Sequence, residues 1–188
     1  MDLDFLKNIP REELLFIIDM IKTKINSPLS SSAGRLFDGV SALLQICRKA
    51  SFHAEAPMLL ESIIDQNESG IYAYDPGKNI SFKATFQELI QDIKNKIALS
   101  KIAAKFHNTI IQLIFGAVKN ISEEYNLNKV VLSGGCFQNK YILERVERKL
   151  IEYGFDVYTH SKIPSNDGGI ALGQIAIAAK KRELGLIK

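Results

Sequence analysis

The chain has 188 residues, of which 46% are hydrophobic and 24% are charged, and its formal net charge is +3. This composition is typical of a globular protein with one domain or two small lobes. The small charge gives no reason to expect a nucleic-acid partner, and no uncharged apolar run reaches the roughly eighteen residues that a membrane-spanning helix needs. Two cysteines without a Cys-x-x-Cys pair predict neither a disulfide framework nor a zinc knuckle, so we expect a cytoplasmic protein.

Helical periodicity dominates the first part of the chain. Apolar residues recur every three or four positions in segments 10–26, 33–49 and 55–66. Pro10 suits the first turn of the first helix, and the second helix places Cys47 on its inward face. We therefore predict a helical part over residues 1–70.

The middle of the chain mixes strand and helix signals. Segments 71–74 and 80–82 read as two strands around a turn-rich link. Thr85 is predicted to cap the next helix, with Glu88 at the capping-box position, and a long helix is predicted over 100–125.

The end of the chain has the pattern of a parallel strand–helix–strand unit. This unit spans 129–159, and a final helix is predicted over 168–182. Residues 71–188 would form a sheet-containing part with four or five strands. The predicted fold class is α/β, with more helix than a complete doubly wound domain has.

Two glycine-containing turns mark the candidate site. The first is Ser133-Gly134-Gly135, which follows the apolar run Val130–Leu132 and precedes a helix. Glycine lets a backbone approach a ligand closely, and a helix start attracts phosphate.

The second turn is Asn166-Asp167-Gly168-Gly169, which lies directly before the final helix. The Asp167 carboxylate has two open interpretations: it caps the helix, or it offers hard oxygen to a metal ion. Because both turns follow strands of one unit, we expect them to meet at one edge of the sheet.

These motifs resemble a known family. Leu-Ser-Gly-Gly-Cys-Phe-Gln-Asn at 132–139 and Pro-Ser-Asn-Asp-Gly-Gly-Ile-Ala-Leu-Gly-Gln at 164–174 resemble the carboxyl-terminal signatures of HypF, the hydrogenase-maturation carbamoyltransferases. Ser-Ser-Ser-Ala-Gly-Arg-Leu-Phe-Asp at 30–38 and Lys-Phe-His-Asn-Thr at 105–109 fit the same family.

The resemblance implies an incomplete active site. HypF proteins are longer chains of modules, and this chain is similar to the carboxyl-terminal lobe of their last domain, which has an actin/Hsp70-like (ribonuclease-H-like) nucleotide-binding fold. The other lobe would bring the His-x-x-x-His metal motif, which this chain lacks. The single lobe over 1–188 would then be a fragment of a longer multidomain protein, and inactive alone.

The resemblance also implies roles for individual residues. Gly134 and Gly135 match the turn that approaches the nucleotide phosphates, and Asn139 matches an asparagine that contacts the nucleotide. Asp38 matches the acid that hydrogen-bonds the ribose. Asp167 matches the carboxylate that completes a divalent-metal site begun by histidines of the other lobe.

The implied reaction passes a carbamoyl group from carbamoyl-adenylate, made with ATP, to a carboxyl-terminal cysteine of the partner HypE. This step serves cyanide-ligand synthesis for [NiFe]-hydrogenase. The implied partners are therefore HypE and the upstream modules of the longer protein. No residue of this chain is assigned as catalytic. One position departs from the family, because Ala54 stands where a glycine is usual.

Two alternatives come from the residues themselves. Cys136 follows a strand and a tight turn, as a nucleophile does, and His160 lies downstream as a possible base, which would make a cysteine hydrolase or amidotransferase. A non-catalytic nucleotide-binding module is the other alternative. His107 reads as a satisfied core or surface histidine, and Asp38, without the family, as a solvated acid.

Overall fold

The structure is a computed structural model that describes residues 3–7, 9–77 and 79–187. It divides into two compact units. The helical unit comprises Met1–Glu68 and Thr85–Ala104, and the sheet unit comprises Ser69–Ala84 and Lys105–Lys188. Among the described residues, no helix is both long and apolar enough to cross a bilayer.

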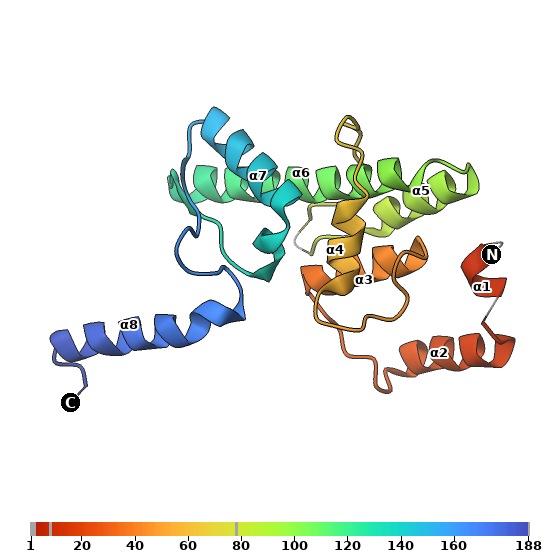
Figure 1. Cartoon of the computed structure of the whole chain (residues 1–188), viewed down its shortest axis with the longest axis horizontal. Coiled ribbons are helices and arrows are strands. Elements are labelled where there is room, and N and C mark those ends of the chain that lie inside the picture. The colour runs from red at the N-terminus through yellow and green to blue at the C-terminus, as the bar shows by residue number, and fades with distance from the viewer. Residues whose placement is uncertain (1–2, 8, 78, 188) are drawn as a thin grey trace. The chain divides into compact units, whose positions relative to one another are not determined.

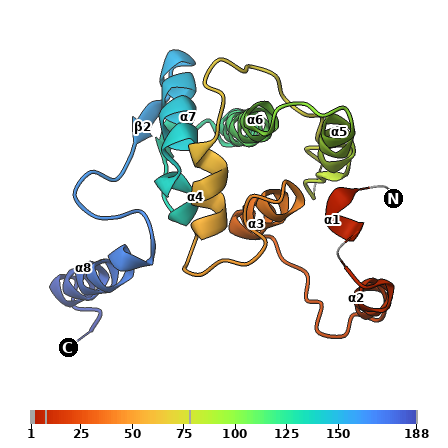
Figure 2. The same cartoon turned by 45° about the vertical axis from the view of Figure 1, so that its right-hand side comes forward.

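The helical unit contains the helices that periodicity predicts. They are α2 (Arg11–Thr23), α3 (Ala33–Leu43), α4 (Glu55–Ser62), most of α5 (Lys83–Lys94) and the start of the long α6 (Leu99–Tyr125). The short helix α1 (Asp4–Lys7) was not predicted. Helices α3 and α4 pack against each other (Figures 1 and 2). Their apolar faces bury Phe37, Val40, Ala56 and Leu60, which form much of this unit's core.

Helix α3 ends earlier than the sequence predicts. Gln45 adopts a left-handed φ of 59°. The N–H of Gln45 donates to Ala42 O and the N–H of Ile46 donates to Ser41 O, each at 3.0 Å. These two bonds are the Schellman ending of a helix, which usually has glycine at the left-handed position. Cys47 therefore lies beyond the helix, half-buried, and its predicted place on an inward helix face is wrong.

The apolar face predicted for α2 is present, but it is not buried. No described residue of α2 is buried, and the side chains of Ile17, Ile18 and Ile21 are 42%, 38% and 61% exposed. The helical periodicity therefore predicted helix α2 correctly, but its apolar residues do not belong to the buried core.

The sheet unit contains the predicted parallel strand–helix–strand unit. Strands β1 (Lys129–Val131) and β2 (Asp156–Tyr158) pair in parallel, with Val130 opposite Val157. Helix α7 (Lys140–Glu152) connects them and lies next to β2 (Figure 2). Its buried residues, Tyr141, Ile142, Val146 and Leu150, form part of the unit's core.

The predicted strands 71–74 and 80–82 are wrong. Over the described residues the only strands are β1 and β2. The middle segment instead has an isolated antiparallel bridge between Asp75 and Ser81. The N–H of Tyr72 donates to Thr109 Oγ1 at 2.8 Å, and the Gly70 carbonyl accepts from Asn108 Nδ2 at 3.1 Å. Side chains of α6 thus satisfy backbone groups that a strand partner would otherwise bond.

The predicted cap of α5 is also wrong. The helix begins at Lys83, before Thr85, and Thr85 is 1% exposed inside its first turns. Ser81 Oγ accepts from the N–H of Lys83 at 3.4 Å, at the start of the helix.

Candidate functional site

The two glycine turns lie together at the carboxyl ends of β1 and β2. The N–H of Leu132 donates to Tyr158 O, and the N–H of Gly134 donates to Ser165 O, both at 2.9 Å. The pairing of the two strands therefore continues into the turns. The position is the edge of a parallel sheet at which α/β proteins bind ligands.

The two glycines of the first turn have different surroundings. Gly134 has φ 105° and ψ 160°, a conformation that is essentially restricted to glycine. Its N–H is used by Ser165, so Gly134 holds the turn rather than offering a donor. Gly135 begins the short 3₁₀-helix η1 (Gly135–Gln138) without a positive φ, and a Cβ built there meets no atom within 4 Å. Gly135 therefore presents open backbone.

Asn139 caps α7. Its Oδ1 accepts from the N–H of Ile142 at 2.9 Å, and its Nδ2 lies 3.1 Å from Nε2 of His107. The side chain is half-buried. An amide nitrogen carries two protons, so this arrangement uses one of the two. The nucleotide contact of Asn139 stays a prediction.

The second turn is capped by Asn166 and not by Asp167. Asn166 Oδ1 accepts from the N–H of Gly168 at 3.0 Å, at the start of η2 (Asp167–Gly169), which leads into α8 (Ile170–Glu183). The capping interpretation of Asp167 is therefore wrong. The Asp167 side chain is exposed and makes no hydrogen bond or ion pair with the described part of the chain. Its carboxylate is available to a ligand from outside.

Ser133 and His160 form a contact that the sequence did not reveal. His160 Nε2 lies 2.9 Å from Ser133 Oγ, which joins the first turn to the segment after β2. The predicted pairing of His160 with Cys136 is not among the contacts of the described residues, and Cys136 is exposed in η1. A pocket of about 310 Å³ lies beside this contact, and its lining includes Leu132, Phe137, His160 and Lys162.

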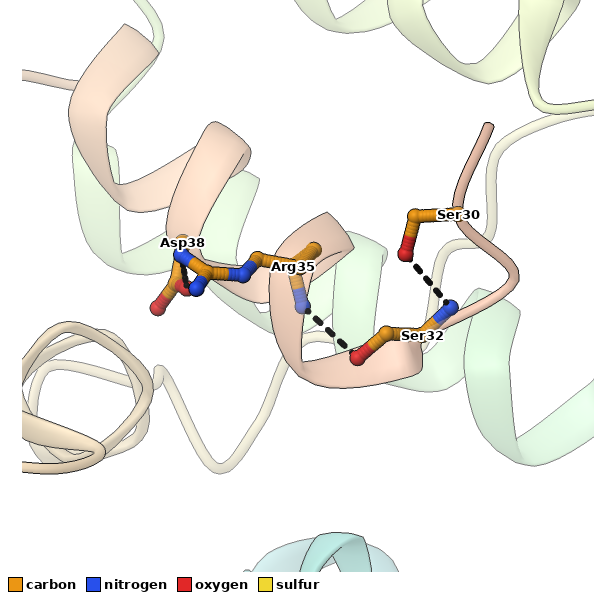
Figure 3. Close-up of polar contacts among 4 residues, drawn as sticks. All are labelled: Ser30, Ser32, Arg35 and Asp38. Carbon is orange, nitrogen blue, oxygen red and sulfur yellow. Dashed lines mark hydrogen bonds and ion pairs between the residues drawn. The ribbon is translucent and has the colours of Figure 1, made fainter. Parts of the chain in front are cut away.

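Asp38 lies on α3 in the helical unit (Figure 3). Ser32 Oγ accepts from the N–H of Arg35 at 3.4 Å and caps the helix. Arg35 Nη1 is 3.4 Å from Asp38 Oδ2, and the two side chains are 79% and 40% exposed. Such exposed pairs contribute little to stability, so Asp38 is not committed to holding the fold together. Its ribose contact stays a prediction.

Ala54 has the backbone conformation that favours glycine. Its φ is 62°, and it directly precedes α4. Glu55 Oε2 accepts from the N–H of Ser51 at 2.5 Å and from its hydroxyl at 2.9 Å. The backbone N–H of Ser51 is the main reason that the pKa of Glu55 is lowered. Although position 54 has alanine where a glycine is usual, its backbone still adopts the left-handed conformation.

The chain's own residues supply little of a metal site. The described residues contain no group of three or more His, Cys, Asp or Glu side chains arranged to hold an ion. Hard divalent cations need several oxygen ligands. Asp167 fits the part of one such ligand, because it is exposed and is not used as a cap.

Comparisons with known proteins identify relatives over most of the chain. The family model described as "Carbamoyltransferase, Kae1-like Domain, second subdomain" matches residues 2–174. The carbamoyltransferase HypF of Rhodobacter capsulatus is 37% identical over 160 residues, which are 85% of this chain and 21% of that protein. The probable carbamoyltransferase HypF of Methanocaldococcus jannaschii is 31% identical over 179 residues, which are 91% of this chain and 23% of that protein.

A solved structure agrees with these relatives. A crystal structure of full-length HypF in a phosphate- and nucleotide-bound form superposes with a TM-score of 0.88 at 40% identity, over 94% of this chain and 24% of that one. The chain thus spans about a quarter or less of these relatives. The predicted fold class, a helix-rich lobe of an actin-like nucleotide-binding domain, is confirmed. The predicted family is confirmed as well: the chain belongs to the family of the second subdomain of the Kae1-like carbamoyltransferase domain found in HypF.

Proposed function

We propose that this chain is the nucleotide-holding lobe of a HypF-type carbamoyltransferase. In this proposal the complete enzyme takes a carbamoyl group from carbamoyl-adenylate and passes it to the carboxyl-terminal cysteine of HypE. The lobe alone binds ATP or AMP weakly and turns nothing over, because it supplies only part of the site.

The observation that carries the proposal is the bonding of the two glycine turns to each other. The Gly134–Ser165 hydrogen bond holds both turns at the strand ends, with Gly135 open and the Asp167 carboxylate exposed. An open backbone turn suits phosphate oxygens, and an unused carboxylate suits a cation that accompanies them. The relative whose structure contains phosphate and nucleotide supports this interpretation.

Each residue then has a distinct task. The backbone at Gly135 approaches the phosphates, Asn139 donates to the nucleotide, and Asp38 accepts from the ribose hydroxyls. Asp167 completes a divalent-metal site whose other ligands come from outside the chain. A metal ion bound there would polarise the carbamoyl carbonyl or hold phosphate oxygens.

The test is Asp167→Ala in a full-length HypF that carries this lobe. We expect carbamoyl transfer to HypE to be lost while carbamoyl-adenylate formation by the upstream modules continues, since only the transfer step needs this carboxylate. Glu152→Ala is the matched control, because it removes another exposed carboxylate of the sheet unit at the end of α7. Normal transfer by the Asp167 variant would remove this residue from the mechanism.

A further inference from the structure

His107 is a fully buried polar side chain next to the candidate site. It lies on α6 with 0% exposure. Its ring meets those of Phe106 and Tyr141 edge-on, at centroid distances of 5.9 and 5.7 Å. Burying an imidazole is costly unless its polar atoms are hydrogen-bonded, and the contact with Asn139 supplies a partner for one ring nitrogen.

The capping bond determines which atom of the Asn139 amide faces His107, and therefore which of the two residues donates the hydrogen bond. The backbone N–H of Ile142 is only a donor, so the Asn139 atom that faces it must be Oδ1. The atom that faces His107 is therefore Nδ2, which only donates. His107 Nε2 must accept this proton, which makes His107 a neutral imidazole with its proton on Nδ1.

The histidine thus fixes the orientation of the amide. A rotated Asn139 amide would place Nδ2 against the Ile142 N–H and Oδ1 against an unprotonated Nε2, and both contacts would be repulsive. With His107 in place, one Nδ2 proton is used and the other is held in one direction by the planar amide. Asn139 is half-buried, so part of the residue reaches the surface.

Neighbouring contacts hold the two elements in register. Tyr141 Oη, on the first turn of α7, donates to Asn108 Oδ1 at 2.9 Å. Further along the same helices, Lys149 Nζ donates to Gln112 Oε1. The residue after His107 on α6 therefore bonds α7 as well, so the imidazole meets Asn139 in a fixed place.

We propose that His107 is a positioning residue for nucleotide binding: it accepts one proton of the Asn139 amide and thereby aims the other at the nucleotide. This inference rests on the proposed function, because it takes Asn139 to be a nucleotide contact. The bound group would be a hydrogen-bond acceptor of the nucleotide. His107 itself stays buried and touches no ligand.

The test measures ATP and AMP affinity of the 188-residue chain by calorimetry for two variants of His107. His107→Phe keeps the aromatic ring and removes the acceptor, and we expect it to weaken binding about tenfold. His107→Gln offers a side-chain oxygen to Asn139 Nδ2 and should restore most of the affinity. A role limited to packing predicts the opposite order, with phenylalanine tolerated better than glutamine.

Thr109→Val is the matched control. Thr109 is another fully buried polar residue of α6, but it bonds the N–H of Tyr72 rather than Asn139. This variant should lower the melting temperature and leave nucleotide affinity unchanged.

Nitrogen-15 NMR of the unmodified chain checks the proton itself. We expect His107 to carry its proton on Nδ1, and a proton on Nε2 would overturn the inference even if His107→Phe does not fold. Wild-type affinity in His107→Phe would overturn the inference alone. Absence of ATP and AMP binding by the wild-type chain would overturn the proposed nucleotide site and this inference with it.

Discussion

Replacing Gly135 by alanine separates the stability of the first turn from its proposed contact with phosphate. Gly135 lacks a positive φ and has no atom within 4 Å of its Cβ position, so alanine fits without strain. A glycine-to-alanine change at such a place stabilises a protein by about 0.4–1 kcal/mol, because it restricts the unfolded chain. We expect a melting temperature that is unchanged or higher by roughly 1–4 °C.

The effect on binding should have the opposite sign. A methyl group at the point of closest approach would hold a phosphate away from the backbone, and a loss of about 1.4 kcal/mol weakens affinity about tenfold. Calorimetry with ATP and thermal unfolding on the same sample measure both quantities. Gly173→Ala is the control, since Gly173 also lacks a positive φ and has open space around it, but lies within α8.

Gly134→Ala should have the opposite effect on stability from Gly135→Ala. At φ 105° and ψ 160° a side chain is strained, so we expect a loss of roughly 1–3 kcal/mol of stability. Gly154→Ala, at φ 102° after α7, should lose a similar amount without affecting nucleotide binding. Unchanged ATP affinity in Gly135→Ala would refute the close approach, and wild-type stability in Gly134→Ala would refute the argument from backbone conformation.

Three further predictions concern other positions. Ala54→Gly should stabilise the chain by up to about 1 kcal/mol, because alanine at φ 62° is strained and glycine is not. Thermal unfolding measures this effect, and a lower melting temperature of the variant would contradict it. Glu55→Gln should lower the melting temperature at neutral pH. Because the pKa of Glu55 is lowered in the folded chain, its carboxylate stabilises the fold above the ordinary pKa of about 4.3, and this stabilisation is lost as the pH falls through the lowered value. The difference in melting temperature between Glu55→Gln and the wild-type chain should therefore vanish in acid. A difference that persists at about pH 2 would exclude this cause. Cys136→Val should leave carbamoyl transfer in full-length HypF nearly unchanged, since His160 bonds Ser133 and the thiol is not the proposed nucleophile; a thousandfold loss with normal stability would instead favour cysteine catalysis.

The elements that periodicity specifies were predictable, and their ends were less so. The long helix over 100–125 and the unit over 129–159 agree closely with α6, β1, α7 and β2. The end of α3 was missed because Gln45, and not glycine, takes the left-handed position. Segment 71–74 has the composition of a strand, but the backbone at Gly70 and Tyr72 bonds side chains that lie more than thirty residues away along the chain, which no local pattern reveals.

The candidate site was predictable in its motifs but not in its contacts. The glycine turns and the exposed Asp167 follow from the sequence and the family resemblance. The pairs Ser133–His160 and His107–Asn139 join residues 27 and 32 positions apart, and only the folded chain brings them together. His107 was predicted to be a satisfied core or surface histidine, and the structure shows the core form, since the ring is buried and bonded.

The Gly-Gly pairs of the two turns differ in what a mutation at each would report. A Cβ at Gly169 would lie 2.9 Å from the carbonyl oxygen of Pro164, and one at Gly168 would lie 3.1 Å from Asn166 Oδ1, whereas one at Gly135 meets nothing. A side chain at Gly169 therefore requires the loop backbone to shift, one at Gly168 requires its neighbours to move by a few tenths of an ångström, and one at Gly135 requires neither. In a diverged homologue, loss of Gly169 would signal a rearranged loop. Under the proposed phosphate contact, loss of Gly135 with the second turn intact would instead indicate a protein that has kept this architecture without binding a nucleotide at the first turn.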